Sequence, residues 1–158
     1  MAVIIQTADF DVKSAVLSVS VGKPAIGAIA IFIGVCRDNN DGAGVLGMEL
    51  EHYPGMTERA IEGMIEQARA RFDLIDALVI HRVGPIKIGE QIVLVVAASP
   101  HRKAAFEACE FLMDYLKTQA PFWKKETLAD GTARWVDARV ADDAALARWG
   151  IESSNAAL

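Results

Sequence analysis

Two β-rich apolar runs, Ala77–Val83 and Gln91–Ala98, are joined by a short segment that contains Gly84-Pro85 and Gly89. Parallel neighbours need a crossover of about a dozen residues or more, whereas a short turn suits antiparallel pairing. We therefore predict that the two runs are antiparallel neighbours. Because most other connections are also short, the chain is predicted to be an α+β protein with a mainly antiparallel sheet, not a doubly wound parallel one.

Alternating and helical spacing of apolar residues predicts the other elements. Strands are expected at 3–6, 25–36 and 45–52, a hairpin at 123–138, and helices at 11–19, 57–72, 100–120 and 142–149. The run 25–36 is apolar throughout, which is typical of a strand covered on both faces. Thr57 and Ser99 are the predicted N-caps of the two long helices. The Asn/Asp/Gly-rich segment 37–44 is expected to be a mobile surface loop.

The chain has 158 residues, of which 53% are hydrophobic and 23% charged, which predicts one packed domain over 1–150 and a frayed tail over 151–158. The N-terminus lacks the pattern of a secretory signal, and the apolar run 25–35 is too short to span a bilayer, so a cytoplasmic location is expected. A net charge of -5 argues against nucleic acid and anionic membranes as partners. Any anion site must therefore be local.

The segment Lys117–Glu126 is the best candidate for such a site, because three lysines surround a proline and two large aromatic residues just after a helical stretch. Lys117 occupies the last turn of that helix, and Met113 lies one turn earlier on the same face. Lys124 and Lys125 should point to opposite faces if the segment enters a strand, so one of them is expected to face a pocket. The alternative is that Trp123 is core and both lysines face solvent.

A second cationic group, His101-Arg102-Lys103, opens the same helix, where backbone amides already favour an anion. The alternative is a solvated turn that is basic by chance. His101 and Lys117 are separated by roughly 24 Å of helix at about 1.5 Å per residue, so no small metabolite contacts both. Either the two ends serve different sites, or a two-fold dimer brings His101 and Arg102 of one subunit to Lys117 of the other. We favour the dimer.

Other polar residues give weaker signals. Arg37 follows a buried strand and Arg139 ends the last hairpin, positions from which a guanidinium reaches a phosphate. His52 and His81 have no spaced partner, so no metal site or cofactor is predicted. Cys36 adjoins Arg37 but has no nearby histidine in the sequence, which makes it a weak candidate nucleophile. The two cysteines form no disulfide pattern, in keeping with a reducing compartment.

Five segments in order along the chain closely resemble the large, catalytic subunit of molybdopterin synthase. They are LEHYPGM at 50–56, IHRVG at 80–84, SPHR at 99–102, FLMDYLK at 111–117 and APFWKKE at 120–126. The resemblance extends from about residue 9 to residue 149. It implies an α/β-hammerhead fold with a small extra β hairpin or subdomain, and a sulfurtransferase of molybdenum cofactor biosynthesis.

In that family, cyclic pyranopterin monophosphate receives two sulfur atoms and becomes molybdopterin. The resemblance implies that the sulfur comes from the C-terminal Gly-Gly thiocarboxylate of a small ubiquitin-like subunit. Two catalytic subunits form a central homodimer within a heterotetramer. The implied catalytic residues are Lys117 and Lys124.

The same resemblance assigns the substrate-binding residues. The implied set is Arg37, His101, Arg102, Arg139, Phe32 and Met113. Cys36 departs from this scheme, because the sulfur comes from the partner. Two other functions remain open from the residues alone: a non-catalytic module that binds an acidic or C-terminal peptide tail, and a metal-free phosphoester enzyme that uses Lys and His.

Overall fold

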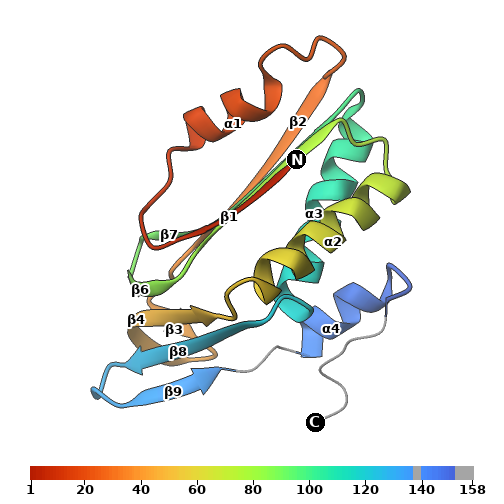
Figure 1. The fold of residues 1–158 in the computed structure, drawn as a ribbon. Coiled ribbons are helices and arrows are strands. Elements are labelled where there is room, and N and C mark those ends of the chain that lie inside the picture. The colour runs from red at the N-terminus through yellow and green to blue at the C-terminus, as the bar shows by residue number, and fades with distance from the viewer. Residues whose placement is uncertain (137–139, 152–158) are drawn as a thin grey trace.

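The computed structural model describes residues 1–136 and 140–151, and Figure 1 shows two sheets with helices packed around them. The first sheet has the strand order β1 (Ala2–Gln6), β5 (Asp76–Arg82), β7 (Gln91–Ser99), β2 (Ala28–Val35). β1 is parallel to β5, while the other two pairs are antiparallel. The predicted antiparallel pairing of 77–83 with 91–98 is confirmed, with Asp76 opposite Ala98 and His81 opposite Val93.

The second sheet lies at one end of the first and forms the smaller subdomain that was expected (Figure 1). Its strand order is β3 (Asn39–Asn40), β4 (Ala43–His52), β8 (Phe122–Leu128), β9 (Ala133–Val136), and β6 (Gly84–Lys87) also pairs with β4. All of these pairs are antiparallel. The β8–β9 hairpin confirms the prediction made for 123–138 as far as residue 136.

Four helices complete the described fold of residues 1–136 and 140–151: α1 (Val12–Ser20), α2 (Met56–Arg71), α3 (Arg102–Thr118) and α4 (Val140–Ala147). α1 covers one face of the first sheet, α2 and α3 cover the other, and α4 packs against α3 (Figure 1). The main core lies between the first sheet and α2 and α3, with Phe111 fully buried against Phe72 and Trp149. The α+β class with a mainly antiparallel sheet is therefore confirmed.

The predicted N-caps of α2 and α3 are wrong by two residues each. Gly55 caps α2 with a positive φ of 81°, and its amide donates to Glu58 Oε2 at 2.6 Å. Thr57 is instead buried in the first turn, where its hydroxyl accepts from the Tyr53 amide and donates to the Pro121 carbonyl oxygen. His101 caps α3, with its own amide donating to Ser99 Oγ at 3.3 Å.

Segment 37–44 was wrongly predicted to be a mobile loop. Asn39 and Asn40 form β3, which pairs with Ala43 and Gly44 across a two-residue turn. Both turn residues have positive φ (52° at Asp41 and 81° at Gly42), as a type I′ hairpin turn requires. Asn40 is 5% exposed, so this hairpin is packed against the rest of the second sheet.

β2 also differs from its prediction, because a single chain does not cover both of its faces. Ile31, Ile33 and Val35 are 44%, 37% and 46% exposed, although Ala30 on the same strand is buried in the main core. The reason is its place in the sheet: β2 is the last strand, and α1 packs against β5 and β7 instead.

Candidate active site

Lys124 and Glu126 lie two residues apart on β8 and therefore point to the same face of the second sheet. This is the inner face, where Leu50 stands opposite Lys124 and belongs to a small core cluster with Cys36 and Ile86. Lys124 Nζ is 3.6 Å from Glu126 Oε1, and the Lys124 side chain is 28% exposed. The ammonium is thus held between a buried carboxylate and open solvent.

Glu126 is 2% exposed and is fixed by two further residues. Asn40 Nδ2 donates to its Oε1 at 2.6 Å, while Arg134 donates to its Oε2 from Nε and Nη2, both at 3.2 Å. Arg134 Nη2 also donates to the Asn40 carbonyl oxygen at 3.3 Å. A buried carboxylate that is paired and hydrogen-bonded in this way holds its cations in defined positions. We infer that Glu126 positions Lys124.

Lys117 is exposed in the last turn of α3 and lies close enough to His81 for its charge to act on that ring. His81 stacks on Phe122 with ring centroids 3.9 Å apart. Phe122 points to the same face of β8 as Lys124, because the two residues are separated by one position. The start of β8 therefore brings Lys117 and Lys124 to the same part of the molecule.

His81 is buried and neutral. Burial is the main reason that the pKa of His81 is lowered to about 4, and the charges of Lys117 and His52 lower it further. Nδ1 donates to the Arg82 carbonyl oxygen at 2.8 Å, which leaves Nε2 as an acceptor. An uncharged ring in this place does not repel the ammonium of Lys117.

His81 should make folding sensitive to mild acid. The unfolded chain takes up a proton near pH 6.5 while the folded chain does so only near pH 4, so its contribution to stability is present above pH 6.5 and is lost as the pH falls towards 4. Between pH 7 and pH 5 this loss should be about 2 kcal/mol. Urea unfolding should show a smaller pH dependence for His81→Phe than for wild type. An equal dependence in both proteins would contradict this account.

Arg37 and Cys36 follow β2 directly. Cys36 is 2% exposed and lies near Lys124, Glu126 and Glu90. Burial raises the pKa of the Cys36 thiol, and the charge of Lys124 only partly opposes that effect. A thiol held in its protonated form is a poor nucleophile. Arg37 is exposed one residue further on, so its guanidinium extends from the same end of β2.

The two predicted pocket walls are both accessible. Phe32 is 39% exposed and shares with Ala30 the face of β2 that α2 and α3 cover. Met113 is half-buried on α3, at the border of the main core and one turn before Lys117. Met113 thus lies next to Lys117, and Phe32 lies on β2, which α3 also contacts.

His101 and Arg102 are exposed at the opposite end of α3. The 17 residues of α3 correspond to about 25 Å of helix, so one chain does not bring them to Lys117. The separation expected from the sequence is therefore confirmed, whereas a shared site remains a prediction. Arg139, and the predicted tail except for Ile151, lie outside the described residues.

The residues just before His101 pack closely against the backbone of Gly27. A Cβ atom on Gly27 would lie 2.1 Å from the Pro100 carbonyl oxygen, and the Gly27 amide donates to the Ser99 carbonyl oxygen at 3.0 Å. Gly27→Ala should therefore shift the start of α3 and lower the free energy of unfolding by about 1–3 kcal/mol.

A matched control for Gly27→Ala is Gly63→Ala on the exposed face of α2. A Cβ at Gly63 meets nothing within 4 Å. The better helix propensity of alanine should raise the free energy of unfolding by about 1 kcal/mol. Urea unfolding of both variants gives the comparison, and a Gly27→Ala protein as stable as wild type would refute the close-approach argument.

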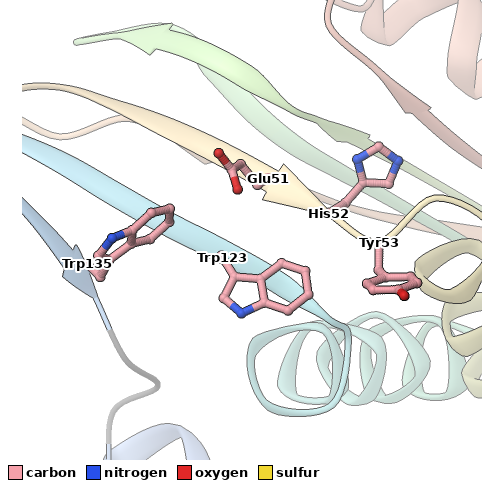
Figure 2. Close-up of a pocket in the computed structure, with 5 residues that line it drawn as sticks. All are labelled: Glu51, His52, Tyr53, Trp123 and Trp135. Atoms are coloured by element: carbon pink, nitrogen blue, oxygen red, sulfur yellow. The ribbon is translucent and has the colours of Figure 1, made fainter.

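The outer face of the second sheet carries a separate aromatic hollow of about 390 Å³ (Figure 2). Its lining residues are Glu51, His52, Tyr53, Trp123 and Trp135. Trp123 is 46% exposed, so it is not core, and it contacts Tyr53 with ring centroids 6.4 Å apart. Lys125 faces this side, with Nζ 5.7 Å from the centre of the Trp135 ring. The two adjacent lysines thus point to opposite faces, as predicted.

Four residues at this site were not predicted from the sequence: Glu126, its anchors Asn40 and Arg134, and the stacked His81. Glu126 had a usable signal, because it alternates with Lys124 and so shares its face. Asn40 was predicted to lie in a loop. Arg134 can be placed beside Glu126 only when the pairing register of the β8–β9 hairpin is known.

In the described part of the chain, no group of three or more His, Cys, Asp and Glu side chains is arranged to hold a metal ion. No helix among those residues is long and apolar enough to cross a membrane.

Comparison with known proteins places these observations in a family. The model of the family described as MoaE protein matches residues 5–119. The chain belongs to the MoaE family. A molybdopterin synthase catalytic subunit from Ralstonia nicotianae is 62% identical over 152 residues, which cover 96% of this chain and 86% of the relative. The resemblance inferred from the five sequence segments is confirmed.

Solved MoaE-family structures also share the fold. A molybdopterin biosynthesis MoaE protein from Burkholderia ambifaria matches with a TM-score of 0.81 and 54% identity, over 95% of this chain and 98% of the other. A molybdopterin synthase from Staphylococcus aureus matches with a TM-score of 0.78 and 27% identity, over 84% of this chain and 95% of the other. The predicted fold is therefore the fold of this family.

Proposed function

We propose that this chain is the catalytic subunit of a molybdopterin synthase and acts as a sulfurtransferase in molybdenum cofactor biosynthesis. The single observation that carries this function is the pair of lysines near the start of β8, in a chain that belongs to the MoaE family. Its substrate is cyclic pyranopterin monophosphate, and its product is the dithiolene molybdopterin.

The charges of the site suit two anions. The pterin phosphate needs cations, for which Arg37, His101, Arg102 and Arg139 are our candidates. The pterin ring needs an apolar slot, for which Phe32 and Met113 are the candidates. The sulfur donor is the C-terminal Gly-Gly thiocarboxylate of a small ubiquitin-like subunit, whose negative charge also needs a cation. An acidic protein of net charge -5 must provide these cations locally.

Lys117 is our candidate for binding the thiocarboxylate. Its exposed position on α3 is accessible to a peptide tail, and its ammonium neutralises the charge that would otherwise keep the tail away from an anionic substrate. The thiocarboxylate sulfur then forms a bond to a pterin side-chain carbon as a bond from that carbon to oxygen breaks. The oxygen leaves as water, or stays on the phosphate when the cyclic phosphate ring opens. Water cleaves the bond between sulfur and the tail carbonyl, so that the tail leaves as a carboxylate.

Lys124 is our candidate for proton transfer and charge stabilisation. Sulfur addition and ring opening move protons to and from oxygen atoms of the substrate, and a half-exposed ammonium held by Glu126 can donate one without changing its position. The Asn40 and Arg134 contacts keep Glu126 in place during this step.

The small sulfur-carrier subunit and a second copy of this chain are the proposed partners, and they assemble as a heterotetramer with the two catalytic subunits at its centre. We place the reaction in the cytoplasm, since Cys36 and Cys109 are both free thiols, in keeping with a reducing compartment.

The decisive experiment mixes this chain with a thiocarboxylated small subunit and cyclic pyranopterin monophosphate. Mass spectrometry should detect a product that gains two sulfur atoms and retains its phosphate. Binding of the tail without turnover would instead identify a peptide-binding module, and release of phosphate without the small subunit would identify a phosphoester enzyme. Either result would overturn the proposal.

A further inference from the structure

Lys117 and Lys124 lie on two elements, α3 and β8, that are joined by a very short link. The C-cap of α3 is Gln119, and β8 begins at Phe122, so the link consists only of residues 120–121. Because the link connects the end of α3 to the start of β8, its position sets the spacing between the two lysines.

Pro121 in this link can be fixed by a backbone hydrogen bond only through its carbonyl oxygen, because proline has no N–H. The ladder between β4 and β8 ends one residue later, at the pair of His52 with Phe122. Thr57 Oγ1, in the first turn of α2, donates to the Pro121 carbonyl oxygen at 3.0 Å. This bond therefore ties α2 to the link just outside the ladder.

The Thr57 hydroxyl is itself held in place. Thr57 is fully buried, and its Oγ1 also accepts a hydrogen bond from the Tyr53 amide at 2.9 Å. The Thr57 amide in turn donates to the Tyr53 carbonyl oxygen at 2.9 Å. A valine would fill nearly the same space, so packing alone does not require the hydroxyl. One hydroxyl thus joins the end of β4, the start of α2 and the link.

Phe122 fixes the other side of the link. Its ring stacks on His81 of β5, with ring centroids 3.9 Å apart and an interplanar angle of 19°. Its amide donates to the Ala120 carbonyl oxygen at 2.9 Å, which closes a three-residue turn around Pro121. The link is therefore held by a hydrogen bond from α2 and by a ring contact from β5.

We propose that Thr57 is a positioning residue of the reaction, which fixes the spacing between Lys117 and Lys124 through its bond to Pro121. The kinetic part of this inference rests on the proposed function, in which Lys117 binds the thiocarboxylate and Lys124 transfers a proton. Sulfur and proton donor must then meet the substrate in one geometry, and a misplacement of about 1 Å can slow a reaction by about 10²-fold.

The spacing is measured without any substrate, by the distance between spin labels on Lys117→Cys and Lys124→Cys. The native thiols of Cys36 and Cys109 are buried and should label poorly. The distance distribution should be narrow in this protein and in its Thr57→Ser version, which keeps the hydroxyl. Thr57→Val should broaden or shift it. An unchanged distribution in Thr57→Val would overturn the anchoring role.

Kinetics test the consequence for the reaction. Thr57→Val should lower kcat for dithiolene formation by about tenfold. KM for the pterin and affinity for the small subunit should change little, because the cations that bind both anions remain. Thr57→Ser should keep kcat within about twofold of wild type. A wild-type kcat in Thr57→Val, or a serine variant as slow as the valine variant, would overturn the positioning role.

Ile65→Val is the control for lost stability. Ile65 lies on the same helix and is buried in the main core, so the change removes one methylene group and no hydrogen bond. Urea unfolding measures the stability lost by each variant, and kcat of Ile65→Val should equal that of wild type. An equal loss of kcat in Ile65→Val and Thr57→Val would show that stability, not positioning, explains the effect.

Combining Thr57→Val with Lys124→Ala separates positioning from other effects on the rate. Because Thr57 acts through the spacing of the lysines, it should change the rate by less than about twofold once Lys124 is absent. A full tenfold loss in that background would overturn the proposal. If the wild-type chain makes no dithiolene, the proposed function fails, and the spin-label distances alone decide whether Thr57 anchors the link.

Discussion

Replacing Lys124 by alanine should lower kcat for dithiolene formation by about 10²–10³-fold, the usual effect of removing one preorganised charged donor from an active site. The reason is geometric: Lys124 Nζ is held 3.6 Å from Glu126 and is the half-exposed cation on the inner face of β8. Single-turnover assays with the thiocarboxylated small subunit would measure the rate. Affinity for that subunit should change little, since Lys117 is the proposed contact for its tail.

The neighbouring lysine provides a matched control. Lys125→Ala removes the same charge and volume one residue away, from the outer face where Lys125 lies over the Trp135 ring. Its rate should stay within about threefold of wild type, because cation–π contacts at exposed sites contribute only about 0.5–1 kcal/mol, and this one is outside the proposed site. If Lys125→Ala lost as much activity as Lys124→Ala, the assignment of the catalytic face would be wrong.

Glu126→Ala should lower the free energy of unfolding by about 2–4 kcal/mol, because removing one member of a buried ionic network leaves its partners without compensation. Asn40 would lose its buried acceptor, while Arg134 and Lys124 would have to turn towards water. We expect activity to fall as well, since Lys124 would no longer be positioned. Urea unfolding and single-turnover rates measure the two effects separately.

Glu107→Ala is the comparison for the stability effect. Glu107 forms a surface pair with Lys103 at 4.0 Å, and such pairs contribute about 0.5 kcal/mol or less. Glu126→Gln, which keeps one acceptor oxygen but removes the charge, should fall between the two. A Glu126→Ala protein as stable as Glu107→Ala would show that the network contributes nothing beyond a surface ion pair.

The elements that could be predicted from the sequence are those set by local periodicity and short connections. The antiparallel pairing of β5 with β7, the β8–β9 hairpin and the end of α3 before Pro121 all follow from residues close together in the chain. The caps were harder to predict. Ser99 and Thr57 are favoured cap residues, but the Thr57 hydroxyl bonds to the Pro121 carbonyl oxygen and Ser99 Oγ to the His101 amide. The helices begin three residues after Ser99, at Arg102, and one residue before Thr57, at Met56.

Some features of the candidate site could likewise be predicted from the sequence, and others could not. The opposite directions of Lys124 and Lys125, and the distance between His101 and Lys117, were available from strand alternation and helix rise alone. The burial of Glu126 was not available, because its partners Asn40 and Arg134 come from two other strands. The same is true of the ring stacking between His81 and Phe122, which joins two different sheets.

By itself, the sequence of this chain determined its family, its α+β class, and which lysine shares a face with which carboxylate. These properties depend on residue identity and on backbone periodicity, which are local. Only the tertiary structure decided that Glu126 is buried, that His81 is neutral, and that β2 is an open apolar edge. The burial of Glu126 and the neutral state of His81 depend on segments distant in the sequence that exclude water from these side chains. The open edge of β2 depends on the strand order, which places β2 last in its sheet.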